Sequence, residues 1–346
     1  MDWFEKLTGF QELGYAQTRR QLEVVDGKLH SHANGKSYGI GELELVSLRT
    51  LRERVHLGSE HAGRLKVGIV QGDVRAMHSM SENAGSMFQV ASQFNLLEMI
   101  SPDITPEQGV TRYQYDGTQG PACAMAAGAA TIYRNYFAEI DGQEGQTEDR
   151  QLDGLADIGV ALCSQLSVPL AALWTMRNGY AMCTRNGLEA IAAYLAILGA
   201  EKTDLLRGML RIGVHSNVEV TDQNGTPPMF VSQAYCSALP VRYAGDNIPT
   251  VQWAAFATLI LEAAYEATLL ATVLNAQRTG SKTVFLTRLG GGVFGNDAGW
   301  IDAAIRRAFR LFENTYLDVR LVSYGVPSAL ALRISEDFSE GSAPKN

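Results

Sequence analysis

Cysteine is scarce in this chain of 346 residues. Its four cysteines include no C-x-x-C pair, which argues against a zinc site and against a disulfide framework. Each cysteine lies among apolar or small residues, so we expect buried free thiols. The four are Cys123, Cys163, Cys183 and Cys236.

The six histidines form no metal-ligand pattern. His30 and His32 lie in a polar, glycine-containing stretch, where solvated side chains are a better expectation than metal ligands. We therefore predict that the protein requires no cofactor and works without a bound metal.

Positive charge is also in deficit, with 29 Lys and Arg against 37 Asp and Glu and a formal net charge of −8. No dense basic stripe is present, which argues against a nucleic-acid partner. A small anionic ligand remains compatible with this charge, because local backbone amides can bind phosphate in an acidic protein.

No secretory leader is visible, because the first ten residues contain acids and lack a basic start followed by an apolar run. The longest apolar stretch, residues 254–276, carries Glu262 and Glu266 at its centre, four positions apart on one helix face. A buried helix of a globular protein fits this stretch better than a membrane span. We expect a cytoplasmic protein with no membrane partner.

Apolar strand-like runs alternate with helical patterns along most of the chain. This alternation predicts an α/β protein of three layers, αβα, with a mixed, largely parallel sheet and insertions. The expected organisation is an N-terminal extension over residues 1–62, a domain over 63–333 with an insertion at about 138–208, and a flexible tail over 334–346. The strands are expected at 63–74, 87–99, 209–221, 229–243, 283–289 and 317–325, and the main helices at 121–137, 155 onward, 186–200 and 251–278.

Residues 283–309, TVFLTRLGGGVFGNDAGWIDAAIRRAF, place four glycines between a strand and a helix. Such glycines permit positive φ and let backbone N–H groups converge near the helix start, where the helix dipole also favours an anion. A diphosphate would fit this loop, although a tight turn without a ligand remains the alternative. The expected apolar face of the helix comprises Ile301, Ala304, Ile305, Ala308, Phe309 and Phe312.

A second glycine-containing helix start occurs at DGTQGPACAMAAG, residues 116–128. It follows about twenty residues, 100–120, with no helical period, and a loop of that length in a compact domain is often functional. Alone this helix start is compatible with core packing, but the two loops together could hold one ligand from both sides.

The order VGIVQGDV, FQVASQFN, small-residue helix, long helix, VFLTRLGGGVFGN and VRLVSYG resembles a macrodomain, the ADP-ribose-binding superfamily. The resemblance spans about residues 63–330 and looks closest to the larger branch that removes ADP-ribose from arginine. The chain departs from the usual pattern after Asn95, where LLEM and the long loop replace early glycines. The usual catalytic loop therefore cannot be transferred to this chain.

The resemblance implies a set of ligand contacts. Asp73 would accept from the adenine amino group, Tyr324 would stack on adenine, and Asn95 would face the distal ribose, with Phe294 against that ribose. The two glycine-containing loops would hold the diphosphate. The loop residues are Gln119, Gly120, Gly290, Gly291, Gly292, Val293, Gly295 and Asn296.

Three carboxylates are candidate catalytic residues for cleaving a glycosidic bond, which needs charge support at the ribose and a base for water. Asp297 is the first choice because it follows the glycine loop, although a helix N-cap is an equal explanation. Glu98 and Asp116 flank the long loop, and ordinary loop carboxylates are their alternative.

Together with the two loops and the nearby acids, the resemblance implies a hydrolase that binds ADP-ribose and removes it from modified protein side chains, with arginine-linked mono-ADP-ribose as the expected substrate. The alternative is a non-enzymatic reader of ADP-ribose or NAD. The expected partners are an ADP-ribosylated protein and ADP-ribose itself.

Overall fold

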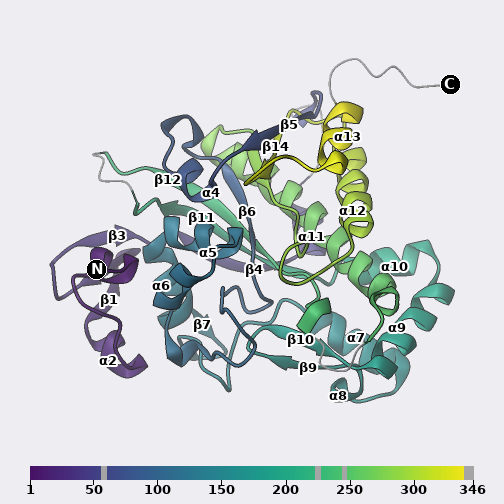
Figure 1. Ribbon diagram of the computed structural model, residues 1–346, viewed down its shortest axis with the longest axis horizontal. Coiled ribbons are helices and arrows are strands. Elements are labelled where there is room, and N and C mark those ends of the chain that lie inside the picture. Colours follow the sequence, from purple (N-terminus) through teal and green to yellow (C-terminus); the bar gives the residue numbers. More distant parts are fainter. Residues whose placement is uncertain (56–60, 223–226, 244–247, 339–346) are drawn as a thin grey trace.

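The computed structural model describes residues 1–55, 61–222, 227–243 and 248–338. At its centre is a seven-stranded sheet with the order β4-β11-β12-β6-β13-β14-β5 (Figure 1). Four successive pairs, from β12 through β5, are parallel, whereas β11 is antiparallel to both of its neighbours. The strands are β4 (Glu42–Ser47), β5 (Lys66–Gln71), β6 (Met87–Ala91), β11 (Arg211–Glu219), β12 (Phe230–Cys236), β13 (Thr283–Leu286) and β14 (Asp318–Ser323).

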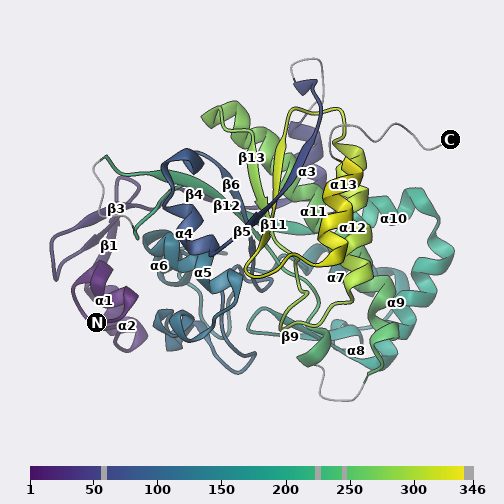
Figure 2. The ribbon, with the colours of Figure 1, turned by 45° about the horizontal axis from the view of Figure 1, so that its top comes forward.

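Helices cover both faces of this sheet, which confirms the predicted fold class (Figure 2). Side chains of β6 alternate between two apolar clusters, so that Met87 joins one and Phe88 and Val90 join the other. The first face carries α3 (Leu48–Arg54), α11 (Thr250–Thr279) and α12 (Ala298–Leu311), and the second carries α4 (Val74–His78), α5 (Gln119–Ala126) and α6 (Gly128–Tyr136).

Helix α11 is long and apolar enough to cross a membrane by composition alone, but 83% of its apolar window is buried in the protein. Its central acid, Glu266, is also buried and accepts from Arg52 Nε at 2.5 Å and from Arg307 Nη1 at 2.7 Å. A buried carboxylate needs such partners. The helix is therefore the core helix that the sequence predicts.

The first 40 residues form a layer beside the domain. They contain α1 (Trp3–Thr8), α2 (Tyr15–Arg20) and a small sheet of β1 (Leu22–Val25), β2 (Lys28–Ser31) and β3 (Ser37–Gly39). An apolar cluster joins this layer to α6. However, β4 pairs with β11 in the central sheet, so part of the predicted extension belongs to the domain.

The predicted insertion holds α7 (Ala156–Leu166), α8 (Leu170–Leu173), α9 (Arg185–Leu198), α10 (Ala200–Arg207) and two hairpins. The hairpins are β7 (Glu139–Ile140) with β8 (Gln143–Glu144), and β9 (Trp174–Arg177) with β10 (Tyr180–Cys183). The chain's last described helix, α13 (Ala329–Phe338), includes the start of the predicted tail, and residues 339–346 lie outside the described residues.

Several expected elements differ from the structure. The strand expected at 229–243 ends at Cys236, and the helix expected at 121–137 is divided into α5 and α6. Strand β6 ends at Ala91, because the chain then turns with Leu96 at φ +64° and Asn95 Oδ1 accepting from Leu97 N. The long loop is not structureless, since it contains the 3-10 turns η3 (Pro106–Gln108) and η4 (Thr111–Tyr115). The predicted apolar face of α12 is confirmed, because all six of its residues are buried.

Candidate functional site

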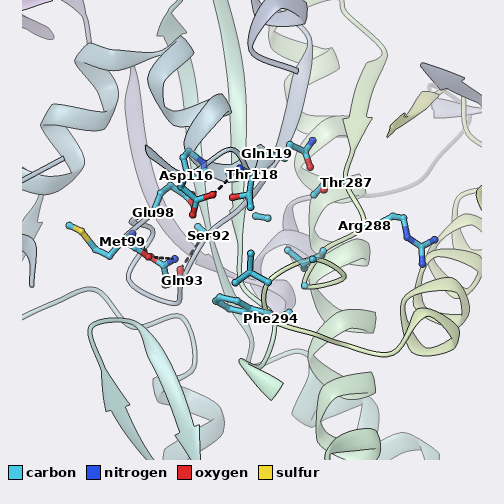
Figure 3. Close-up of a pocket in the computed structure, with 18 of the residues that line it drawn as sticks. Ser92, Gln93, Glu98, Met99, Asp116, Thr118, Gln119, Thr287, Arg288 and Phe294 are labelled. Carbon is cyan, nitrogen blue, oxygen red and sulfur yellow. Dashed lines mark hydrogen bonds between the residues drawn. The ribbon is translucent and has the colours of Figure 1, made fainter. Parts of the chain in front are cut away.

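A cleft opens beyond the carboxyl ends of β6, β12 and β13, where ligands bind in sheets of this kind. It holds about 820 Å³ of space, part of which is open to solvent. Figure 3 shows Glu98, Asp116 and Thr118 on one side and Phe294 on the opposite side. Its polar and aromatic lining includes Ser92, Gln93, Glu98, Asp116, Thr118, Gln119, Tyr180, Tyr243, Arg288 and Phe294.

Glu98 is the buried acid of this cleft. Its side chain is 2% exposed, and Oε1 has no hydrogen-bond partner among the described residues. Burial raises the pKa of this carboxyl well above its usual value; buried Arg134 opposes the shift, and Asp116 adds to it. A carboxyl group with a raised pKa keeps its proton to higher pH, and a protonated carboxyl can donate to a reacting group.

The turn that carries Glu98 is held on both sides. Glu98 N donates to Tyr113 Oη at 2.9 Å, and Met99 N donates to Gln93 Oε1 at 2.9 Å. Tyr180, from the β9–β10 hairpin, donates its hydroxyl to the carbonyl of Met99 at 2.6 Å. These contacts fix the backbone, so the acid is placed before any ligand arrives.

Gly120 makes room for this acid at the start of α5. A Cβ at Gly120 would lie 2.0 Å from the carbonyl oxygen of Ala91 and 2.4 Å from Glu98 Oε2. Neither distance is possible for a real side chain, so this position requires glycine. The start of α5 therefore packs directly on the end of β6.

The N-terminus of α5 separates the cleft from a second cavity of about 830 Å³, also partly open to solvent. Asp116, Thr118 and Gln119 line both cavities. The N–H groups of Gln119 and Gly120 have no acceptor among the described residues, and no side chain caps the helix. Free amides at a helix start form a site for an anion between the two cavities.

The β13–α12 loop lies across the cleft from α5, and its glycines have different roles. Gly290, at φ +70°, has Ala238 Cβ only 2.5 Å from the position of its missing Cβ. Gly292 needs no positive φ and would place a Cβ in open space, yet it lines the cleft. The N–H groups of Gly292 and Val293 donate to no acceptor among the described residues. This loop can therefore present free amides to a ligand.

Three aromatic rings close one end of the cleft. The ring centroid of Phe294 lies 5.3 Å from that of Tyr180 and 5.7 Å from that of Tyr243. Sequence reasoning identified Phe294 but missed both tyrosines, because they come from separate segments without a local motif. Gln93 and Thr118 lie inside the FQVASQFN and DGTQGPACAMAAG segments that the sequence singled out, but neither was named there as a site residue.

The remaining predicted residues lie in different places. Asp73 and Tyr324 both line the second cavity, and Tyr324 is 83% exposed. Asn95 lines neither cavity; its side chain is buried and donates to Gln151 Oε1 at 2.8 Å. Gly291, Gly295 and Asn296 support the glycine loop from outside the cleft, whereas Gly290, Gly292, Val293 and Phe294 line it.

Asp297 is the N-cap of α12, which is the structural role that the sequence offered as the alternative to a catalytic one. Its Oδ1 accepts from Gly299 N at 2.8 Å, and the residue is exposed and lines neither cavity. Among the three candidate acids, Glu98 and Asp116 line the cleft. The geometry therefore favours these two over Asp297.

No protein-family model matches the chain, and no curated protein matches it. Among solved structures, the poly(ADP-ribose) glycohydrolase of Thermomonospora curvata is 13% identical, covers 92% of this chain and 93% of its own, and gives a TM-score of 0.44. The poly(ADP-ribose) glycohydrolase of Deinococcus radiodurans, solved with ADP-ribose, is 13% identical. The match covers 87% of this chain and 95% of that one, with a TM-score of 0.43. Likeness this distant does not decide a function.

Proposed function

We propose that this protein is a glycohydrolase that binds ADP-ribose and releases it from modified protein side chains. The observation that carries the proposal is Glu98, a buried and fixed acid whose Oε1 has no partner among the described residues. It lines a cleft that shares Asp116, Thr118 and Gln119 with the second cavity. The N–H groups at the start of α5 that lack an acceptor in the described part of the chain lie between the two cavities, and those of the glycine loop line the cleft. An elongated ligand with a central diphosphate matches this order of groups.

In this arrangement adenine occupies the second cavity, beside Asp73 and Tyr324. The diphosphate crosses the start of α5 and faces the N–H groups of Gly292 and Val293. The distal ribose then lies in the first cavity, between Phe294 and Glu98. This placement keeps the ligand roles that the sequence resemblance implies for these residues, except that Asn95 makes no contact from its buried position.

Cleavage follows from the two acids of the cleft. Neutral Glu98 donates its proton to the leaving atom as the bond to the ribose anomeric carbon breaks. Water attacks that carbon and loses a proton to Asp116, which gives ADP-ribose and the unmodified side chain. The positive charge that develops on the ribose is stabilised by the Asp116 carboxylate.

Arginine is the proposed acceptor side chain. A guanidinium is planar and cationic, and carboxylates bind it better than they bind a neutral side chain. Asp116 lines the cleft, which is partly open to solvent, so its carboxylate can meet a guanidinium that enters with the distal ribose.

The test is release of ADP-ribose from arginine-, glutamate- and serine-linked substrates and from poly(ADP-ribose). We expect release from the arginine-linked substrate, with loss of about 100- to 10,000-fold in rate for Glu98→Gln. Asp103→Asn, which changes an exposed carboxylate of the same loop outside both cavities, is the matched control and should keep full activity. Tight binding of ADP-ribose without release from any substrate would indicate a reader and contradict the proposal.

A further inference from the structure

A separate cluster of metal-ligating side chains lies on the N-terminal sheet, outside both cavities. Glu23 is on β1, opposite His30 on β2, and His32 follows two residues after His30. His32 N donates to the carbonyl of Gln21 at 3.0 Å, which extends the antiparallel ladder to this residue. Because side chains alternate along a strand, all three project from the same face of the hairpin.

The hairpin is preformed rather than dependent on a metal. Leu22 and Leu29 project from its opposite face and are 4% and 2% exposed within the apolar cluster that joins the N-terminal layer to α6. The backbone that carries the three side chains is therefore held by core packing. Their positions on one face follow from this register.

We infer that Glu23, His30 and His32 form a binding site for a divalent transition metal, with zinc as the occupant. One nitrogen of each histidine and one carboxylate oxygen all lie within 4.8 Å of one another. Zinc binds imidazole nitrogen and carboxylate oxygen at about 2.0–2.2 Å, so its tetrahedral ligands are about 3.3 Å apart. The Glu23 and His32 side chains are 48% and 45% exposed, which leaves them room for the small rotations required.

Ser37 on β3 supplies an independent observation. It pairs with His30 in the β2–β3 register, and its Oγ lies 2.9 Å from His30 Nδ1. When Nδ1 carries the ring proton, it donates to Ser37 and leaves the Nε2 lone pair for a metal. Histidine ligands are characteristically oriented in this way through their other nitrogen. Water would complete the four-coordinate site.

The experiment titrates the metal-free full-length chain with zinc chloride by calorimetry and follows the histidine ring signals by NMR. We expect one zinc per chain and shifts confined to the His30 and His32 rings. Ser37→Ala should weaken binding by about 10- to 100-fold, as a partner of a ligand does, and His30→Ala or His32→Ala by more. Asp26→Asn, in the turn of the same hairpin, removes a carboxylate outside the cluster and should bind zinc as the unaltered protein does.

Unchanged zinc binding by the His30→Ala, His32→Ala double variant would overturn the inference, as would zinc shifts at other histidines. Absence of zinc binding by the unaltered chain would also overturn it. Thermal denaturation of each variant without zinc checks that the hairpin has kept its fold. The site is independent of ADP-ribose, so the same variants should bind ADP-ribose normally whichever result is obtained.

Discussion

Replacing Gly292 by alanine should weaken ADP-ribose binding without destabilising the fold. The missing Cβ of Gly292 would meet no atom within 4 Å, and the residue has no positive φ. A surface substitution of this kind changes the free energy of unfolding by about 0.5 kcal/mol or less. Because Gly292 lines the cleft, the added methyl group would instead take up space there, where the proposed diphosphate meets the loop amides.

The expected loss of affinity follows from the contacts removed. A hydrogen bond from an amide to a charged phosphate contributes about 1.5–3 kcal/mol, so losing one raises Kd by about 10- to 150-fold. Gly290→Ala is the matched contrast, because its Cβ would lie 2.5 Å from Ala238 Cβ and its φ is +70°. Left-handed strain and overpacking together should cost about 2–5 kcal/mol of folding stability there.

Calorimetry with ADP-ribose and chemical denaturation of both variants distinguish these effects. We expect Gly292→Ala to lose affinity with an unchanged denaturation midpoint, and Gly290→Ala to unfold at clearly lower denaturant. Unaltered ADP-ribose affinity in Gly292→Ala would refute the role given to the loop amides. Equal destabilisation of the two variants would refute the distinction between their glycines.

Three further changes test other parts of the site. Asp297→Ala removes the N-cap of α12 and should lower the free energy of unfolding by about 1 kcal/mol in denaturation experiments. A fall in turnover beyond about threefold would instead show that Asp297 takes part in catalysis. Glu12 accepts from Val110 N, Thr111 N and Tyr136 Oη at 2.7–2.8 Å, so Glu12→Gln should lower the free energy of unfolding by about 1–3 kcal/mol; an unchanged midpoint would contradict this bracing of the long loop. In the folded protein the pKa of Glu98 is raised above its usual value of 4.5. The protonated carboxyl therefore contributes its full stability below pH 4.5, and this contribution should be lost as pH rises through the raised pKa. Glu98→Gln should remove this pH dependence from denaturation curves. The same titration should reduce turnover at high pH, and a rate that rises with pH instead would exclude Glu98 as the proton donor.

Elements with a long and regular pattern could be predicted from sequence. The apolar face of α12 repeats over several turns, and α11 is apolar over most of its length. The sequence therefore predicted the buried face of α12 and nearly the correct ends of α11. Strand β6 was predicted too long because its apolar run continues into a turn. That turn depends on the local hydrogen bond between Asn95 and Leu97, which composition does not reveal.

The acid of the cleft could be named from sequence but not ranked. Tyr113 contacts the backbone of Glu98, Tyr180 contacts the backbone of Met99, and Gly120 lies against the Glu98 carboxyl. These three residues come from separate segments. Asp297, by contrast, has the same local signature whether it caps a helix or faces a ribose. Only the three-dimensional arrangement separates the two.

A crystal structure with ADP-ribose tests the central claim most directly. We predict that the anomeric carbon of the distal ribose lies within reach of the Glu98 carboxyl, that the diphosphate lies between Gly120 and Gly292, and that adenine lies beside Asp73. A ribose turned toward Asp297, or adenine in the cavity of Glu98, would contradict the account.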